Sequence, residues 1–123
     1  MGAALKVLVV EDDSTLREAL CDTIEYGGYR VWSACDGAAA LQQLERQPVD
    51  LIISDVQMAG MDGERLLREV RARSPELPFV MITAHGSGQH AVAAMRDGAT
   101  DYLLKPFAAE VLLEMLARFF FFF

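Results

Sequence analysis

Short apolar segments alternate with longer amphipathic segments along this chain. The apolar segments are rich in Val, Ile and Leu and show no regular alternation with polar residues, which is typical of strands buried on both faces. The amphipathic segments place apolar residues three and four positions apart, as a helix with one buried face does. The pattern predicts strands at residues 5–10, 29–34, 49–54, 78–83 and 101–105. It predicts helices at residues 14–28, 36–47, 63–74, 87–99 and 108–119.

Five strand–helix units in alternation favour an α/β fold. Parallel strands need crossover connections, and the helices in those connections cover both faces of the sheet. Right-handed crossovers leave few arrangements for five units in a chain of this length. We therefore expect one flavodoxin-like (βα)5 three-layer sandwich with the strand order 2-1-3-4-5.

The composition limits the partners of this fold. The 123 residues suffice for one domain, and 11 Lys and Arg against 18 Asp and Glu give a net charge of -7. An acidic domain repels phosphate backbones and anionic lipids, so we expect no direct contact with nucleic acid or with a membrane. No apolar segment is long enough to cross a bilayer. The same excess of carboxylates suits a cation site.

The cysteines bear on the compartment of the protein. Cys21 and Cys35 form no C-x-x-C pair, and we interpret both as reduced, buried residues. The short apolar stretch at the N-terminus is followed by charges without a cleavage-type region, so we expect no signal peptide. Both features indicate a cytoplasmic protein.

Polar side chains follow four of the five predicted strands. The carboxyl ends of parallel strands meet at one edge of a sheet, and ligands of open α/β sheets bind there. Strand two ends without a comparable group. The other strands contribute three carboxylates after strand one, one carboxylate after strand three, a hydroxyl at the end of strand four and an ammonium at the end of strand five: Glu11, Asp12, Asp13, Asp55, Thr83 and Lys105.

Together these groups predict a site for a divalent cation and a phosphoryl group. Two carboxylates about 4 Å apart repel by roughly 4 kcal/mol at an effective dielectric near 20, so a convergent cluster needs a proton or a cation. Oxygen ligands without Cys or His suit Mg²⁺. Lys105 and Thr83 offer an ammonium and a hydroxyl to phosphoryl oxygens. Asp55, at the middle strand, is the natural nucleophile.

Each group also has a simpler interpretation when it is taken alone. Asp13, Ser14 or Thr15 would cap a helix. Asp55 would be an exposed acid in a loop. Because four separate strand ends rarely supply complementary groups by chance, the combination favours a site.

The segments that contain these groups resemble a known family. "VLVVEDD", "LIISDVQMAGMDG", "VMITA" and "DGATDYLLKPF" occur in the order and at the spacing of receiver domains of two-component response regulators. The stretch from "ITAHG" to "LLKPF" particularly resembles receivers of enhancer-binding transcription activators of the nitrogen-regulation, dicarboxylate-transport and flagellar types. We expect residues 4–118 to form the receiver domain.

The resemblance implies a role for the acidic residues. Asp55 matches the phosphoacceptor. Glu11 and Asp12 match the acidic pair that holds Mg²⁺, with Asp13 left as the helix cap. The family's third protein ligand is a main-chain carbonyl two residues beyond the acceptor, which is that of Gln57 here. Glu11 stands in place of the more common Asp and is longer by one methylene group.

The resemblance also assigns the groups after strands four and five. Lys105 matches the lysine that pairs with the acceptor and then with its phosphate, and the bond before Pro106 matches a cis peptide. Thr83 and Tyr102 match the hydroxyl and the aromatic ring whose coupled movement carries the signal. Ala59 stands where such families usually have proline, a change that loosens the loop after the acceptor and removes no reacting group.

The implied function is phosphoryl transfer in two-component signalling. A sensor histidine kinase would present a phosphohistidine to Asp55, with Mg²⁺ and Lys105 holding the phosphoryl oxygens. The chain would catalyse only its own phosphorylation and slow dephosphorylation, so it is not an enzyme in the usual sense. Its output would be the surface of helix four, strand five and helix five, which would control transcription, with a phosphorylation-dependent homodimer as the expected assembly.

Activators of this type are longer chains, in which an ATPase domain and a DNA-binding domain follow the receiver. We therefore expect either a receiver cut from such a chain or a stand-alone one. Residues 119–123, all Phe, form a tail that favours a truncation end, because an exposed aromatic run has no core to fill. A role in covering a dimer interface is the other interpretation of this tail.

Three other functions stay open at this point. An aspartyl phosphatase would want a second acid where Gln57 stands, as well as a lid. A flavin or nucleotide binding module would need a Gly- or Ser/Thr-rich cradle after strand one, where this chain is acidic. A pseudo-receiver that acts only as a protein interaction module is the strongest alternative, although it usually lacks the acceptor or the lysine, and both Asp55 and Lys105 are present.

Overall fold

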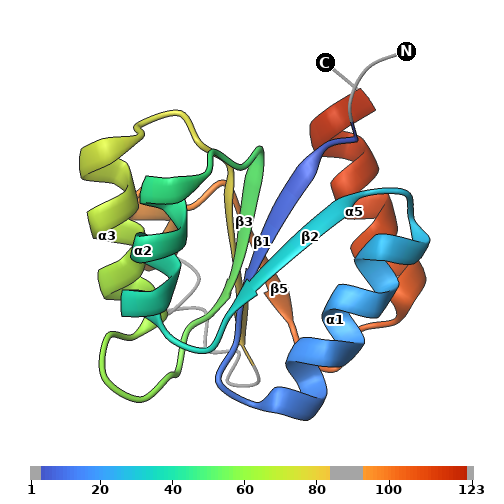
Figure 1. The fold of residues 1–123 in the computed structure, drawn as a ribbon, viewed down its shortest axis with the longest axis horizontal. Helices are drawn as coiled ribbons and strands as arrows, with labels where there is room; N and C mark the ends of the chain where they lie inside the picture. The colour runs from blue at the N-terminus through green and yellow to red at the C-terminus, as the bar shows by residue number, and fades with distance from the viewer. Residues whose placement is uncertain (1–3, 84–92, 122–123) are drawn as a thin grey trace.

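The protein is built in three layers around a five-stranded sheet, with α2 and α3 on one side and α1 and α5 on the other (Figure 1). The structure, a computed structural model, describes residues 4–83 and 93–121. The strands are β1 (Lys6–Val10), β2 (Arg30–Ala34), β3 (Leu51–Asp55), β4 (Phe79–Thr83) and β5 (Asp101–Leu104). The helices are α1 (Ser14–Tyr26), α2 (Gly37–Arg46), α3 (Gly63–Arg73) and α5 (Ala109–Phe121). The helix predicted at 87–99 lies largely outside the described residues, within which 93–96 are helical.

The sheet has the strand order β2-β1-β3-β4-β5, and all four pairings are parallel. The predicted fold and strand order are therefore confirmed. In the register, Asp55 lies opposite Ile82, and Thr83 lies opposite Leu104. Because all strands run the same way, the residues that end them lie at one edge of the sheet, which is the lower edge in Figure 1.

The sheet separates two apolar cores. Strands β3 and β4 are buried at every position, as their continuous apolar sequences predict. Successive residues of a strand point to opposite faces. Leu8 and Val10 therefore pack with α2 and α3, whereas Val7 and Val9 pack with α1 and α5.

Aspartates fix the starts of three helices near the site edge. Asp13 accepts hydrogen bonds from the backbone N–H groups of Thr15 and Leu16, so its predicted role as a helix cap is confirmed. Asp36 and Asp62 cap α2 and α3 in the same way. Each carboxylate satisfies N–H groups that a helix start leaves without a partner, and it complements the helix dipole.

The end of α5 differs from the expected unpacked tail. The helix continues through Phe121, and the side chains of Phe119 and Phe120 pack against the core between the sheet and α1. The Phe120 ring lies 5.6 Å from the Tyr29 ring, centroid to centroid. The first two rings of the aromatic run therefore do have a core to contact, while residues 122–123 lie outside the described part of the chain.

The prediction that both cysteines are buried is wrong. Cys21 is half-buried on α1 and Cys35 is exposed, because it follows β2 in the turn before α2 rather than lying within the sheet. Both thiols are free. Among the described residues, none of the helices combines the length and apolar character that crossing a bilayer requires.

Candidate functional site

Three carboxylates converge at the carboxyl edge of the sheet. Glu11 and Asp12 follow β1, and Asp55 ends β3. One oxygen from each of the three lies within 4.8 Å of the others. Asp12 is exposed, and it borders an open depression of about 550 Å³ that Gln57 and Glu64 also line. An all-oxygen cluster that is buried on one side and open on the other fits Mg²⁺, which binds a few carboxylates and keeps several waters.

Lys105 joins two of these carboxylates. Its Nζ lies 3.0 Å from Glu11 Oε1 and 3.1 Å from Asp55 Oδ2. The Lys105 backbone N–H donates to the Thr83 carbonyl at 2.8 Å, so the residue continues the pairing of β5 with β4. The bond between Lys105 and Pro106 is cis, as predicted. Of the four predicted carboxylates, the structure thus brings Glu11, Asp12 and Asp55 into one cluster with Lys105, whereas the Asp13 side chain caps α1.

The surroundings shift the protonation of Glu11 and Lys105. Burial raises the pKa of Glu11 from 4.5 to about 7, although the hydrogen bonds from Lys105 and from the Asp13 backbone N–H oppose that rise. For Lys105, burial lowers the pKa, but hydrogen bonds and charge attraction to Glu11 and Asp55 outweigh it, so the pKa is raised overall. Glu11 is only 1% exposed, so ionising its carboxyl group costs more free energy than ionising the other carboxyl groups of the cluster.

Glu11→Gln should stabilise the metal-free protein more at pH 8 than at pH 5. A carboxyl whose pKa is higher in the folded than in the unfolded chain favours folding while it is protonated. That contribution is lost as pH rises from about 4.5 through about 7. Glutamine cannot ionise, so the advantage of the variant over the unchanged protein should grow by about 2 kcal/mol between the two pH values. Urea unfolding with EDTA present, followed by Trp32 fluorescence, measures the difference.

The exposed Glu114 of α5 provides the control for this prediction. Glu114→Gln removes the same charge from a solvated helix surface and should change stability by a similar small amount at both pH values. An equal effect of Glu11→Gln at pH 5 and pH 8 would show that Glu11 does not titrate in this range.

The loop between β3 and α3 is attached at both ends to residues at the end of β3. Asp55 Oδ1 accepts a hydrogen bond of 3.4 Å from the Gln57 backbone N–H. At the other end of the loop, the Gly63 N–H donates to the Val56 carbonyl at 2.9 Å. A Cβ on Gly63 would overlap the Asp55 carbonyl oxygen and lie 2.9 Å from the Val56 Cα. The start of α3 therefore packs directly on the backbone of Asp55.

Ala59 contributes a contact that proline could not make. Its backbone N–H lies 3.4 Å from Asp12 Oδ2, as a long hydrogen bond between the β3–α3 loop and the β1–α1 loop. Proline has no N–H. Alanine in place of the usual proline thus allows a hydrogen bond to the Asp12 carboxylate.

Thr83 and Tyr102 lie close to each other beside this cluster. Thr83 is 2% exposed at the end of β4, and Tyr102 is half-buried on the adjacent strand β5. Burial raises the pKa of Tyr102, and the Thr83 side chain partly offsets that rise. Within the described residues the buried Tyr102 hydroxyl makes no hydrogen bond of regular geometry. Their coupled movement stays a prediction.

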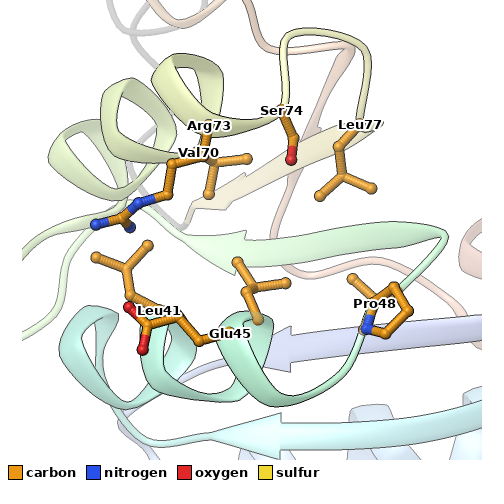
Figure 2. A pocket seen from close by; sticks show the side chains of 9 residues that line it. Leu41, Glu45, Pro48, Val70, Arg73, Ser74 and Leu77 are labelled. Atoms are coloured by element: carbon orange, nitrogen blue, oxygen red, sulfur yellow. The ribbon is translucent and has the colours of Figure 1, made fainter.

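A separate cavity of about 340 Å³ lies at the opposite edge of the sheet. Side chains of α2 and α3 and of the segments before β3 and β4 line it, among them Leu41, Val70 and Leu77 (Figure 2). Its lining is mostly apolar, with Glu45 and Arg73 among the polar residues. None of the residues that line it was predicted to belong to the site.

Sequence reasoning missed two residues that shape the site. Gly63 was expected only as a helix start, and its contact with the Asp55 carbonyl has no signature in the sequence. Arg17 was expected only as a polar residue of helix one, yet its Nη1 donates to the Glu11 carbonyl at 2.8 Å. Both contacts join residues that the folded sheet edge brings together.

Comparison with known proteins adds the family context. The sequence profile of the response regulator receiver domain matches residues 7–117. The response regulator protein FleR of Pseudomonas aeruginosa is 52% identical over 115 residues, which are 94% of this chain and 24% of FleR. The C4-dicarboxylate transport transcriptional regulatory protein DctD of Rhizobium meliloti is 41% identical over 118 residues, which are 96% of this chain and 26% of DctD. The chain thus spans about a quarter of the length of these two relatives.

The fold is also similar to that of a solved chemotaxis protein. The structure of CheY4 of Vibrio cholerae superimposes with a TM-score of 0.90 at 37% sequence identity. The match covers 94% of this chain and 98% of CheY4. Unlike FleR and DctD, CheY4 is therefore similar to this chain over nearly its whole length.

Proposed function

Because this chain belongs to the response regulator receiver domain family, we propose that Asp55 accepts a phosphoryl group from a sensor histidine kinase. The predicted family is confirmed, and so is the likeness to receivers of the DctD type. A receiver domain is a signalling module rather than an enzyme that turns over a separate substrate. The reaction that we propose is therefore the modification of the chain itself.

The contact of Lys105 with both Asp55 and Glu11 is the observation that supports this proposal most directly. An Asp55 oxygen would attack the phosphorus of a phosphohistidine, so that a P–O bond forms while the P–N bond breaks and the imidazole leaves. Lys105 would place its positive charge where the phosphoryl oxygens gather negative charge. The Glu11 carboxylate would hold the ammonium in place.

The acidic cluster fits the metal that this reaction needs. Glu11, Asp12, Asp55 and the main-chain carbonyl of Gln57 would hold Mg²⁺, which when bound supplies positive charge to the phosphoryl oxygens. The ion would also relieve the repulsion among the carboxylates, which Lys105 alone balances incompletely. The open side toward the depression beside Asp12 leaves room for waters and for the donor.

Phosphorylation would then shift a conformational equilibrium. The Thr83 hydroxyl would donate to a phosphoryl oxygen, and Tyr102 would rotate into the space that Thr83 leaves. The exposed apolar residues Met95, Leu104 and Val111 lie on the 93–96 segment, β5 and α5. These elements would form the output surface of a phosphorylation-dependent homodimer.

We further infer that this receiver controls transcription through output domains of a longer chain. The support is that the receiver corresponds to about a quarter of FleR and of the transcriptional regulatory protein DctD. An ATPase domain and a DNA-binding domain are the expected output parts. The free thiols of Cys21 and Cys35 agree with a reducing cytoplasm as the site of the reaction.

Acetyl phosphate should add one phosphoryl group to the protein only when Mg²⁺ is present. Intact mass spectrometry after incubation with the donor, with Mg²⁺ or with EDTA, measures the modified fraction. The cation should be required because Lys105 offsets only part of the negative charge that Asp55, Glu11 and Asp12 present to an anionic donor. Equal modification in EDTA would contradict the metal-dependent mechanism, and no modification in either condition would favour a phosphorylation-independent interaction module.

A further inference from the structure

The loop between β1 and α1 holds two of the three clustered carboxylates, so its conformation decides whether they face Asp55. One end of the loop is held by the Glu11 N–H, which donates to the Ala34 carbonyl at 3.1 Å. Within the loop, the Asp13 N–H donates to Glu11 Oε2 at 3.2 Å. These two contacts hold the backbone N–H and the side chain of Glu11. The 3.4 Å hydrogen bond from the Ala59 N–H reaches the Asp12 carboxylate. None of the three contacts involves the carbonyl of the peptide that joins Glu11 to Asp12.

Arg17 makes the contact that orients this peptide. Its Nη1 donates to the Glu11 carbonyl oxygen at 2.8 Å from the first turns of α1. That carbonyl lies in the same planar peptide unit as the N and Cα atoms of Asp12. A hydrogen bond that fixes the direction of this carbonyl therefore also fixes the orientation of the Asp12 backbone, from which the Asp12 side chain projects.

The guanidinium is well placed to keep this role. Arg17 is half-buried in a groove between α1 and β2, where Cys21 and Ser33 also lie. Its attachment is to a backbone oxygen, so the contact does not neutralise any of the three carboxylates directly. A charged donor makes a stronger hydrogen bond to a carbonyl than a neutral one.

We propose that Arg17 is a positioning residue for the cation site, holding the Glu11–Asp12 peptide so that both carboxylates converge on Asp55. This inference rests on the proposed function, because it takes the cluster to bind Mg²⁺. The same arginine adds a positive charge near the site, and that charge alone would weaken the binding of a cation. If Arg17 acts mainly by positioning the carboxylates, replacing it will weaken Mg²⁺ binding. If it acts mainly by charge repulsion, replacing it will strengthen Mg²⁺ binding.

The test is the affinity of the whole chain for Mg²⁺ alone, measured by isothermal titration calorimetry. Arg17→Met removes the donor and the charge, and we expect it to weaken binding about tenfold or more, as the loss of a group that orients a metal ligand typically does. Arg17→Gln keeps a side-chain N–H donor without the charge and should bind Mg²⁺ with an affinity between those of the unchanged and the Met chains. Arg73→Met removes an exposed arginine of α3 that pairs with Glu69 at the surface, and it should leave the affinity unchanged.

The unfolding midpoint of each variant in urea, from Trp32 fluorescence without metal, separates positioning from a general loss of structure. Weaker Mg²⁺ binding by a variant that unfolds at nearly the wild-type midpoint supports the inference. Equal or tighter binding by the Met and Gln variants would overturn it and leave the proposed function intact. Absence of Mg²⁺ binding by the unchanged chain would overturn the metal-dependent function and this inference together.

Discussion

The substitution Asp55→Asn will abolish the uptake of a phosphoryl group from acetyl phosphate. An amide has no anionic oxygen to attack phosphorus, and the two other carboxylates of the cluster already have other partners. Glu11 is held by Lys105, and Asp12 Oδ2 accepts the hydrogen bond from the Ala59 N–H. The fold should persist, because the change removes one of several repelling charges from the cluster. Intact mass spectrometry in the presence of Mg²⁺ should show only the unmodified chain.

Asp22→Asn is the matched control for this experiment. Asp22 is an exposed residue of α1, so the variant has the same charge change without touching the cluster. It should take up a phosphoryl group as the unchanged protein does. A phosphorylated Asp55→Asn chain would mean that another residue is the acceptor, and peptide mapping would identify it.

The substitution Gly63→Ala will destabilise the protein by about 3 kcal/mol or more, because the added methyl group has no space. It would meet the Asp55 carbonyl oxygen and the Val56 Cα, and both are backbone atoms that cannot rotate away. Either α3 or β3 has to shift, and overpacking of a rigid site costs more than the small gain in helix propensity. Urea unfolding followed by Trp32 fluorescence measures the loss of stability.

Gly37→Ala tests the same change at an equivalent position. Gly37 also begins a helix directly after an aspartate cap, but the three atoms nearest to a Cβ there all belong to the Met61 side chain, the first at 2.9 Å. Methionine has three rotatable bonds and adapts to a new neighbour, so the loss of stability should be within about 1 kcal/mol. Similar losses for the two variants would contradict a special contact between Gly63 and the acceptor backbone.

The fold could be predicted from the sequence because the apolar segments of β1, β3 and β4 are short, continuous and separated by helical patterns. Parallel pairing and right-handed crossovers then leave little choice of order. The positions of Asp55 and Lys105 followed from the same reasoning, since groups that end neighbouring parallel strands meet at one edge. Their contact at 3.1 Å agrees with that reasoning.

The contacts that the sequence could not reveal depend on close approach between segments. Nothing in the local pattern distinguishes Gly63, which packs on the Asp55 carbonyl, from the other helix-starting glycine, Gly37. Cys35 was predicted to be buried because cysteine usually is, but its position in a turn leaves it exposed. The packing of Phe120 on Tyr29 likewise depends on where α5 crosses the sheet.

The attachment of the β3–α3 loop at both ends has a consequence for chain length. The Val56 carbonyl binds the Gly63 N–H, so the residues between them form a closed segment with a fixed base. Inserted or deleted residues inside this segment would change how far it projects into solvent and would leave its base in place. Length variation here is thus a route by which the rim of the site can be reshaped without moving Asp55.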